Sequence, residues 1–253
     1  MPAPPDPPAS PALFGHARVS AVLFDVDFTL IHPGPMFQGV GYHAFCARHL
    51  IDVDPAAFDA AVASAASILD DSDGSAYDAE IFVAYTRHII EQMGGKAGGT
   101  AEAVDACARE IYAEWAANHH FELYDDVPAV LQRLNSAGIR VGLISNSHRC
   151  LDSFQSHFEL RDFIAASVSS ADHGYMKPHP SIFRKVLEDL RVPPADAVMV
   201  GDSVGQDIEG ALRAGMRAVL LHRSEQATPR ADELRERGVP IIRSLTELMN
   251  LVA

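Results

Sequence analysis

Acidic side chains gather where two predicted strands end. Asp25 and Asp27 directly follow one short apolar run, and Asp202 directly follows another. In open α/β sheets, ligands bind beyond the carboxyl ends of the strands, where the strand order reverses. An Asp after a strand is also often the N-cap of a helix, which is the alternative for each residue taken singly. As a set, the following polar residues are candidates for one site: Asp25, Asp27, Ser145, Asn146, Lys177, Asp202 and Asp207.

The charge of this set calls for a cation. Asp25, Asp27, Asp202 and Asp207 are carboxylates, and Lys177 is the one lysine among them. Like charges within about 4–6 Å raise one another's pKa values, so such a cluster is unfavourable without compensation. A hard divalent cation suits oxygen ligands, and Mg²⁺ usually takes one or two carboxylates together with phosphate and water. The residues therefore predict a Mg²⁺ site that, with Lys177, holds an anionic phosphoryl group against an aspartate.

The elements that position this set alternate between strands and helices after residue 121. Helices are indicated by apolar residues at i, i+3, i+4 and i+7, as in 127–134. The predicted strands are 19–24, 139–144, 164–169, 197–200 and 218–221, with a further candidate at 240–242. Repeated β-α-β units predict a parallel sheet that is covered by helices on both faces.

A different pattern separates the first strand from the others. Residues 35–120 contain Ala-rich stretches with apolar residues at helical spacing, which predicts about four helices and no strands. The core is therefore discontinuous, comprising 18–34 plus 121–253. Residues 1–17 are rich in Pro and Ala and are predicted to form a flexible tail. The expected fold class is α/β, a three-layer doubly wound parallel sheet with an inserted all-helical domain.

The candidate residues also stand in four motifs. Asp25-Val26-Asp27-Phe28-Thr29 resembles the first motif (DxDxT) of the haloacid dehalogenase (HAD) superfamily. Ser145 resembles the second motif of that family, Lys177-Pro178 the third, and the segment 201–207 the fourth (GDxxxxD). The motifs occur in the family's order across nearly the whole chain after the tail. The helical block is similar to the family's helical cap, so the resemblance implies a HAD-type Rossmann-like core with such a cap.

The resemblance implies a role for each motif residue. Asp25 would attack phosphorus and become an aspartyl-phosphate, and Asp27 would protonate the leaving oxygen and then activate water. Mg²⁺ would be held by the Asp25 side chain, the backbone carbonyl of Asp27 and Asp202, while Asp207 would orient the metal-bound waters or Lys177. The residues expected to bind substrate phosphate are Thr29, Ser145, Asn146 and Lys177.

These features predict a Mg²⁺-dependent phosphatase that hydrolyses a small phosphorylated metabolite. A phosphotransferase (mutase) or a 2-haloacid dehalogenase on the same fold is an alternative, although such dehalogenases keep no acid at the position of Asp27. A non-enzymatic phosphoacceptor or binding module is a third alternative. Receiver domains are the model for it, but they are shorter and lack inserted helices.

Some residues near the motifs are given no chemical role. Many relatives have Gly where this chain has Phe28, so Phe28 implies either an ordinary φ or an apolar wall beside the leaving group. His148 has no partner at metal-ligand spacing and is interpreted as incidental. Trp115 is interpreted as a packing residue of the helical block. Tyr42 is interpreted in the same way, with contact to the leaving group as the alternative.

Composition limits the partners and the compartment. The 253 residues include 34 acidic residues and 20 Lys or Arg, which gives a net charge of −14. This charge disfavours nucleic acid and anionic membranes as partners, and no apolar run approaches the roughly 18 residues of a membrane helix. The first residues do not resemble a secretory signal. Cys46, Cys107 and Cys150 form an odd, scattered set that is interpreted as reduced thiols. We expect a soluble, cytoplasmic protein whose oligomeric state stays open.

Overall fold

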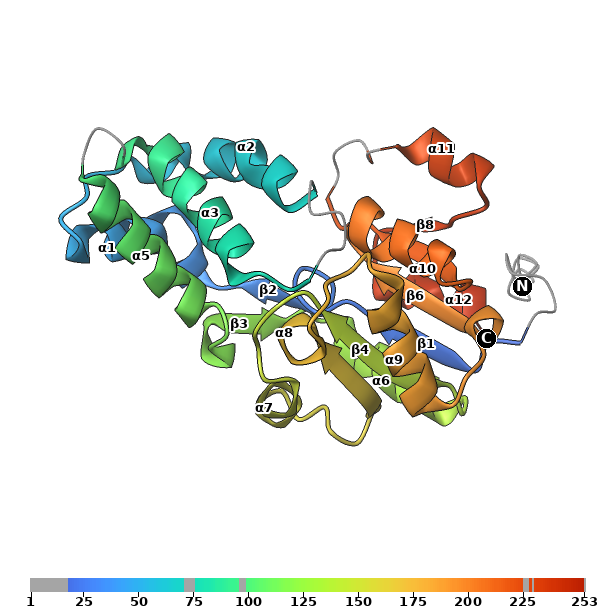
Figure 1. Cartoon of the computed structure of the whole chain (residues 1–253). Coiled ribbons are helices and arrows are strands. Elements are labelled where there is room, and N and C mark those ends of the chain that lie inside the picture. The colour runs from blue at the N-terminus through green and yellow to red at the C-terminus, as the bar shows by residue number, and fades with distance from the viewer. Residues whose placement is uncertain (1–17, 71–75, 96–98, 225–227, 229, 253) are drawn as a thin grey trace, which may run out of the picture.

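A computed structural model describes residues 18–70, 76–95, 99–224, 228 and 230–252, so the predicted tail 1–17 lies outside the described residues. Its main element is a six-stranded sheet in the order β5-β4-β1-β6-β7-β8 (Figure 1). The strands are β1 (Ala21–Phe24), β4 (Arg140–Ser145), β5 (Ile164–Ser169), β6 (Ala197–Gly201), β7 (Arg217–Leu221) and β8 (Ile241–Ile242). Neighbouring strands are parallel throughout, which confirms the predicted α/β class. The strand order reverses at β1, because β4 and β5 lie on one side of it and β6, β7 and β8 on the other.

The strands are apolar at consecutive positions because both faces of the sheet are covered. All four residues of β1 are fully buried. Val22 and Phe24 pack on one face with helix α6, whereas Leu23 packs on the opposite face with helix α9. Successive strand residues point to opposite faces, so a strand between two helical layers needs apolar side chains on both.

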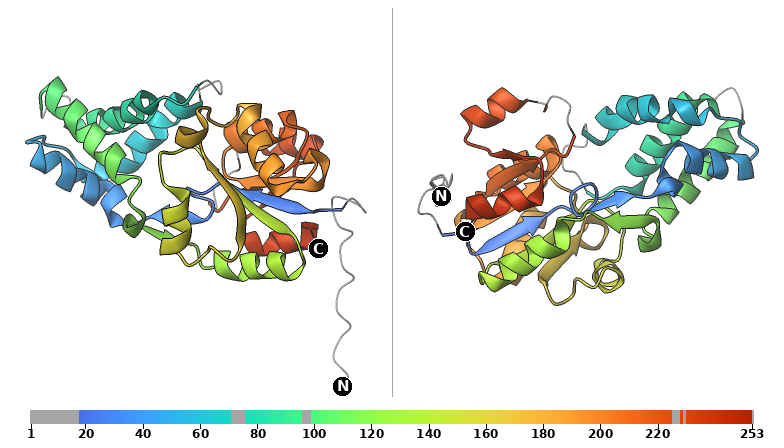
Figure 2. Two further views of the ribbon diagram at one scale, coloured as in Figure 1. Left: turned by 60° about the horizontal axis from the view of Figure 1, so that its bottom comes forward. Right: turned by 180° about the vertical axis from the view of Figure 1, so that it is seen from behind.

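The two helical layers are visible in Figure 2. The layer on the Val22 face consists of α6 (Val127–Ser136), α7 (Leu151–His157), η7 (Leu245–Leu248) and α12 (Met249–Val252). The layer on the Leu23 face consists of α9 (Pro180–Leu190), α10 (Glu209–Arg213) and α11 (Ala231–Glu236). Short elements complete the core: α8 (Ser170–His173), η5 (Pro194–Asp196) and η6 (Val204–Ile208).

The segment between the first two core strands folds as helices beyond one end of the sheet (Figure 1). Its helices are α1 (Gly39–Arg48), α2 (Phe58–Asp70), α3 (Ala79–Ile90) and α5 (Ala101–Glu114), joined through η1 (Pro35–Phe37), η2 (Pro55–Ala57), η3 (Glu91–Gly95) and η4 (Asn118–His120). These elements are called the cap below. The buried side chains of the cap continue into the hydrophobic cluster on the Val22 face of the sheet, through residues such as Phe37 and Phe121.

Both connections between the core and the cap lie side by side. β2 (Ile31–Pro33) leads into the cap and β3 (Phe121–Leu123) leads out of it, and the two strands form an antiparallel pair. His32 is opposite Glu122 in this pair. The cap is thus joined to the core by one two-stranded ribbon.

Element boundaries differ from the predicted ones at two places near the candidate site. The helix predicted from about 206 begins instead with a wide turn at Val204–Ile208, and regular helix α10 starts only at Glu209. The helix predicted from about 148 begins at Leu151, because residues 146–150 form a loop. In the described part of the chain, none of the helices combines the length and apolar character needed to cross a membrane.

Candidate active site

The loop after β1 places the first motif at the edge of the sheet. The Asp25 N–H donates to the carbonyl of Val200 (2.9 Å), so the pairing of β1 with β6 extends one residue beyond the strand. The chain then makes a helix-like turn in which the Leu30 N–H donates to the carbonyl of Val26 (2.9 Å). This turn, rather than a regular strand, sets the direction of Asp27. The side chains of Asp25 and Asp27 both line the same cavity.

Phe28 occupies an unusual backbone conformation within this turn. Its φ is +63°, in the left-handed region that favours glycine, and its side chain is 45% exposed and lines the cavity. A left-handed conformation costs a non-glycine residue about 1–2 kcal/mol. The sequence predicted either an ordinary φ for Phe28 or a side chain that forms an apolar wall. The ordinary φ is wrong, whereas the Phe28 ring does form an apolar part of the cavity wall.

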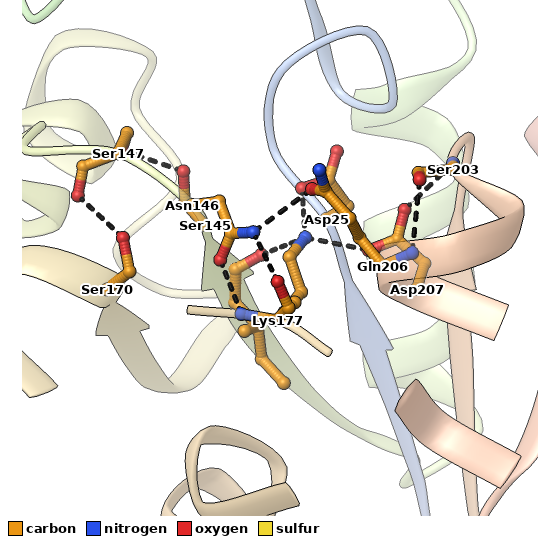
Figure 3. A network of polar contacts seen from close by, with 10 residues as sticks. Asp25, Ser145, Asn146, Ser147, Ser170, Lys177, Ser203, Gln206 and Asp207 are labelled. Carbon is orange, nitrogen blue, oxygen red and sulfur yellow. Dashed lines mark hydrogen bonds and ion pairs between the residues drawn. The ribbon is translucent and has the colours of Figure 1, made fainter. Parts of the chain in front are cut away.

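Lys177 is the buried cation of the site. Its side chain is 1% exposed, and Nζ donates to Oδ1 of Asp25 (2.5 Å), to Oδ1 of Asp207 (2.7 Å) and to the carbonyl of Ile144 (3.1 Å) (Figure 3). An ammonium group has three N–H donors, so these contacts use all of them. Lys177 therefore holds the first and fourth motifs together from the buried side.

The fourth motif fixes Asp207 through close packing. Oδ2 of Asp207 accepts a hydrogen bond from the Ser203 N–H (3.0 Å), which leaves Oδ1 for Lys177. The carboxylate also lies against the backbone of Gly201, where a Cβ would stand only 2.2 Å from Oδ2. Glycine is required at this position because any side chain would displace Asp207.

The carboxylates retain more negative charge than Lys177 can neutralise. Burial raises the pKa of Asp25 to about 7, and the charge of Asp207 adds to this increase while Lys177 opposes it. Enclosure in the protein also raises the pKa of Asp202, with further contributions from Asp25 and Asp207. Burial alone would lower the pKa of Lys177, but the charges of Asp207 and Asp25 outweigh it and raise that pKa. Lys177 is therefore charged at neutral pH, and protons compete for the neighbouring carboxylates.

Three of the four predicted metal-site acids form a compact group. Carboxylate oxygens of Asp25, Asp202 and Asp207 lie within 4.8 Å of one another. Asp202 opens into the cavity, whereas Asp25 and Asp207 are buried. The side chain of Asp27 turns away from this group toward Arg149. A set of hard oxygen donors with excess negative charge fits a divalent cation such as Mg²⁺.

Asn146 makes no contact with the acids and instead positions the Lys177 backbone. Its Oδ1 accepts from the Lys177 N–H (2.7 Å), and its Nδ2 donates to the Lys177 carbonyl (2.9 Å) and to Oε1 of Gln206 (3.0 Å). The side-chain amide thus joins the second, third and fourth motifs (Figure 3). Asn146 also lines the cavity.

The other two predicted phosphate-binding residues are fully buried. Ser145 shares a hydrogen bond with the hydroxyl of Ser147 (2.8 Å between the oxygens) and ends β4 beside Lys177. Neither Ser145 nor Thr29 is part of the cavity wall, and Oγ1 of Thr29 has no hydrogen-bond partner among the described residues. The Thr29 carbonyl accepts from Arg223 (3.1 Å). The structure therefore places Thr29 within the loop that carries Asp27, and not on the surface that faces a substrate.

The partner of Asp27 is a residue that sequence reasoning missed. Arg149 is fully buried, and its Nη2 donates to Oδ1 of Asp27 (3.0 Å) and to the carbonyl of Trp115 (2.9 Å). Its Nη1 donates to Asn118 (3.0 Å), and the guanidinium lies 4.3 Å from the centre of the Phe121 ring. Arg149 thus connects Asp27 to the segment that leads out of the cap. The sequence signal that could have identified Arg149 is its position, four residues after Ser145 in the same short loop.

The acids form one end of a cavity of about 380 Å³ that lies between the core and the cap. Its wall includes Tyr42, Trp115 and His148. Trp115 packs in the cap, with its ring centroid 4.6 Å from that of Phe37, and it also lines the cavity. His148, which the sequence left without a chemical role, lines the cavity. Gln206 bridges the two parts of the molecule by donating to the carbonyl of Leu69 on α2 (3.4 Å).

Comparison with known proteins agrees with this arrangement. A family model of haloacid dehalogenase-like hydrolases matches residues 19–215. Haloacid dehalogenase-like hydrolase domain-containing protein 3 of Xenopus laevis is 30% identical over 122 residues, which cover 48% of this chain and 50% of that protein. The chain thus spans half the length of this relative. N-acylneuraminate-9-phosphatase of Homo sapiens is 30% identical over 224 residues, which cover 81% of this chain and 83% of that protein.

A solved structure shows the same fold at lower identity. The HAD phosphatase of Thermococcus onnurineus superposes with a TM-score of 0.57 and 22% identity, covering 93% of this chain and 98% of that structure. The family model covers most of the chain, including the four motifs, and the fold is shared. The chain therefore belongs to the haloacid dehalogenase-like hydrolase family.

Proposed function

We propose that this enzyme hydrolyses phosphate monoesters through a covalent phosphoryl group on Asp25, with Mg²⁺ as its cofactor. The observation that carries the proposal is the position of the Asp25 carboxylate at the acidic end of the cavity. There it is held by Lys177 and grouped with Asp202 and Asp207. Membership of the hydrolase family and the similarity to N-acylneuraminate-9-phosphatase support a reaction at a phosphate ester.

The residues suit a resident Mg²⁺. Asp25 and Asp202 would hold it, with the backbone carbonyl of Asp27 as the third protein oxygen and Asp207 supporting Lys177. The cation would supply positive charge to the phosphoryl oxygens and would offset both the burial of Asp25 and the repulsion from Asp207, which raise the pKa of Asp25. Lys177 adds a second, fixed positive charge on the opposite, buried side of Asp25.

In the first step, an Asp25 carboxylate oxygen attacks phosphorus and the bond from phosphorus to the ester oxygen breaks. Asp27 gives its proton to the departing oxygen, so the alcohol leaves uncharged. Ser145 is fully buried at the end of β4 and is not part of the cavity wall, so it would support phosphate binding through its hydrogen bond with Ser147, which does line the cavity. Lys177 keeps Asp25 in place and offsets charge as it spreads over the phosphoryl oxygens.

In the second step, Asp27 takes a proton from a water molecule, which attacks phosphorus of the aspartyl-phosphate. The bond between phosphorus and the Asp25 oxygen breaks, which releases inorganic phosphate, restores the Asp25 carboxylate and returns Asp27 to its protonated form. Arg149 positions Asp27 for both steps through the contact between Nη2 and Oδ1. The presence of an acid with its own buried partner at this position counts against a 2-haloacid dehalogenase, because halide departs without a proton.

The proposal extends to the partners and the compartment. A small phosphorylated metabolite is the partner that fits a cavity of this size, and the net charge of −14 disfavours nucleic acid. The three thiols are free, and Sγ of Cys107 lies 3.9 Å from Sγ of Cys46 without a disulfide. Free thiols suit the cytoplasm, which we keep as the proposed location.

Two substitutions test the mechanism with acetyl phosphate, whose leaving group needs no protonation. Asp25→Asn should reduce release of inorganic phosphate by about four to six orders of magnitude, since loss of a nucleophile has effects of this size. Asp27→Asn should still form the phosphoenzyme, visible by intact mass spectrometry, but should hydrolyse it slowly. Asp162→Asn changes an exposed acid and serves as the control. Full activity of Asp25→Asn would overturn the proposal. Transfer of the phosphoryl group to a substrate hydroxyl without release of inorganic phosphate would indicate a mutase.

A further inference from the structure

Among the described residues, the cap side of the cavity has no charged group, whereas the acidic end, called the floor below, has four carboxylates. Helix α2 contributes Val62, Ala66 and Leu69, which lie at i, i+4 and i+7 and therefore on one helical face. Helix α3 contributes Phe82, Tyr85 and Thr86, helix α5 contributes Ile111 and Tyr112, and helix α1 contributes Tyr42. Four cap helices thus present uncharged side chains, most of them apolar or aromatic, to the space above the acids.

Aromatic rings surround the region between the cap helices and the floor. The ring centroids of Phe28 and Trp115 are 6.2 Å apart, and those of Tyr112 and His148 are 4.2 Å apart. All four residues line the cavity. Aromatic rings at such separations provide flat apolar surfaces on which another ring can stack.

Positive charge is missing from the described part of the cavity wall. Among the described lining residues there is no Lys or Arg, and burial lowers the pKa of His148, which keeps it neutral at neutral pH. The nearby buried cations are already paired, Lys177 with Asp25 and Asp207, and Arg149 with Asp27. A second anionic group on a substrate would therefore be desolvated without an ionic partner, which is strongly unfavourable.

The dimensions set the size of the leaving group. An apolar protein cavity of about 150 Å³ is enough to bind benzene. The cavity here, about 380 Å³, therefore holds a phosphoryl group at the acidic floor and one ring-sized group against the cap.

From these features we infer that the enzyme selects phosphate monoesters whose leaving group is uncharged, apolar and about the size of one ring, and discriminates against esters that carry a second anionic group. This inference rests on the proposed phosphatase function and specifies its substrate class. The geometry that carries it is the apolar face of α2, the aromatic rings near the floor and the absence of Lys and Arg among the described lining residues.

The test compares esters of primary alcohols, so that the same kind of bond breaks in each. We would measure kcat/KM of the full-length protein with Mg²⁺ for 2-phenylethyl phosphate, glycerol phosphate, phosphoglycolate and a hexose bisphosphate. Acetyl phosphate has the small leaving group acetate, so its hydrolysis reports the chemical step with little contact between the leaving group and the cap. We expect 2-phenylethyl phosphate to exceed each of the others by about tenfold or more, since a single apolar contact in a pocket gives discrimination of this order.

A matched pair of substitutions on α2 tests whether the lack of a cation on the cavity wall disfavours esters with a second anionic group. Ala66 lines the cavity and Ala60 does not, and both are exposed on the same helix. Ala66→Lys should raise kcat/KM for phosphoglycolate relative to 2-phenylethyl phosphate by about tenfold, because it supplies the absent cation. Ala60→Lys makes the same chemical change outside the cavity and should leave the ratio unchanged.

The outcomes separate the inference from the function on which it rests. Hydrolysis of acetyl phosphate with equal or better use of phosphoglycolate or the bisphosphate than of 2-phenylethyl phosphate would overturn the substrate class and leave the phosphatase standing. No hydrolysis of acetyl phosphate by a Mg²⁺-saturated enzyme would overturn both. If the ratio of kcat/KM for phosphoglycolate to that for 2-phenylethyl phosphate changes equally in Ala66→Lys and Ala60→Lys, the cavity-facing side of α2 does not select the substrate.

Discussion

The floor and the cap wall of the cavity follow opposite designs. On the floor, Asp25, Asp27 and Asp207 are each held by a buried cation or a backbone N–H. On the wall, apolar and aromatic side chains from four cap helices meet the same space, and none of the described wall residues of the cap forms an ion pair. Fixed charges position a reacting phosphoryl group, whereas an apolar surface selects by size and polarity. Substitutions on the floor should therefore affect all phosphate esters alike, and substitutions on the wall should change their ranking.

The largest effect is expected from Lys177→Met. Removing the ammonium leaves Asp25 and Asp207 buried beside each other, and breaking such a buried pair typically costs about 3–5 kcal/mol of stability. The rate should fall for every ester by about the same factor, which we expect to exceed 10³ because charge stabilisation is lost. Urea unfolding measures the effect on stability, and phosphate release measures the effect on the rate.

Lys185→Met is the control: it removes an exposed helix ion pair with Asp189 and should change stability by less than about 1 kcal/mol. A rate for Lys177→Met within tenfold of the parent would contradict the role of the floor.

Gly201→Ala should also damage the floor without removing any polar group. The new Cβ would stand 2.2 Å from Oδ2 of Asp207, so this carboxylate must leave the Ser203 N–H or Lys177. Leaving a buried polar group unpaired costs about 1–3 kcal/mol, and kcat should fall for all esters together. Gly205→Ala is the control in the same motif, because a Cβ there meets nothing within 4 Å. Equal behaviour of the two variants in thermal melts and phosphate-release assays would show that the close packing is unimportant.

A third prediction concerns the pH dependence of Mg²⁺ binding. The pKa of Asp25 is raised to about 7, first by burial and further by Asp207, so a proton occupies the metal-free site below that pH. In metal-free protein, the stabilising effect of this proton is present below pH 4 and is lost as the pH rises through about 7. Mg²⁺ must displace the proton at low pH, so its apparent Kd should rise about tenfold per unit of pH below 7.

Thermal melts with Mg²⁺ and with EDTA measure this competition. The increase in Tm caused by Mg²⁺ should be larger at pH 8 than at pH 5.5. At a Mg²⁺ concentration of about 100 times Kd, the stabilisation should be about 2.7 kcal/mol. An increase in Tm that is the same at both pH values would show that Asp25 does not take part in the metal site.

The smallest effect on stability is expected from Phe28→Gly on the wall. Glycine relieves the left-handed strain of about 1–2 kcal/mol but adds about 0.5–1 kcal/mol of chain entropy to the unfolded state, so the two terms largely cancel. The lost ring should raise KM for 2-phenylethyl phosphate several-fold more than KM for glycerol phosphate. Steady-state kinetics with both esters check this, and an equal change for both would place Phe28 outside the selecting surface.

The sheet and the acids of the floor could be predicted because they depend on local sequence. Apolar runs such as 197–200 indicate buried strands, and parallel strands must bring their carboxyl ends to one edge. The family resemblance then assigned roles to Asp25 and Asp27. Neither depended on knowing how distant side chains pack, which explains why the predicted parallel sheet agrees with the structure.

The contacts that join the motifs could not be predicted in the same way. Arg149 reaches Asp27 across 122 residues of sequence, and no periodicity links the two positions. Asn146 was expected to bind phosphate, but its amide is occupied by the Lys177 backbone and Gln206. The cavity wall depends on how the cap docks. Trp115 was therefore assigned to packing alone, and His148 was given no role.

The paired strands β2 and β3 restrict how the cap can move. Because His32 and Glu122 stand opposite each other in one ribbon, the two linkers bend together instead of rotating independently. Elsewhere, the described cap contacts the core backbone where the Tyr77 N–H donates to the carbonyl of Gly174 (2.9 Å), and it contacts Gln206 through the carbonyl of Leu69. Arg149 adds further contacts from the core to the cap through Trp115 and Asn118. If substrate enters by opening of the cap about this ribbon, strengthening the contact at Tyr77 or at Leu69 should slow exchange of substrate and product while the bound reaction proceeds unchanged.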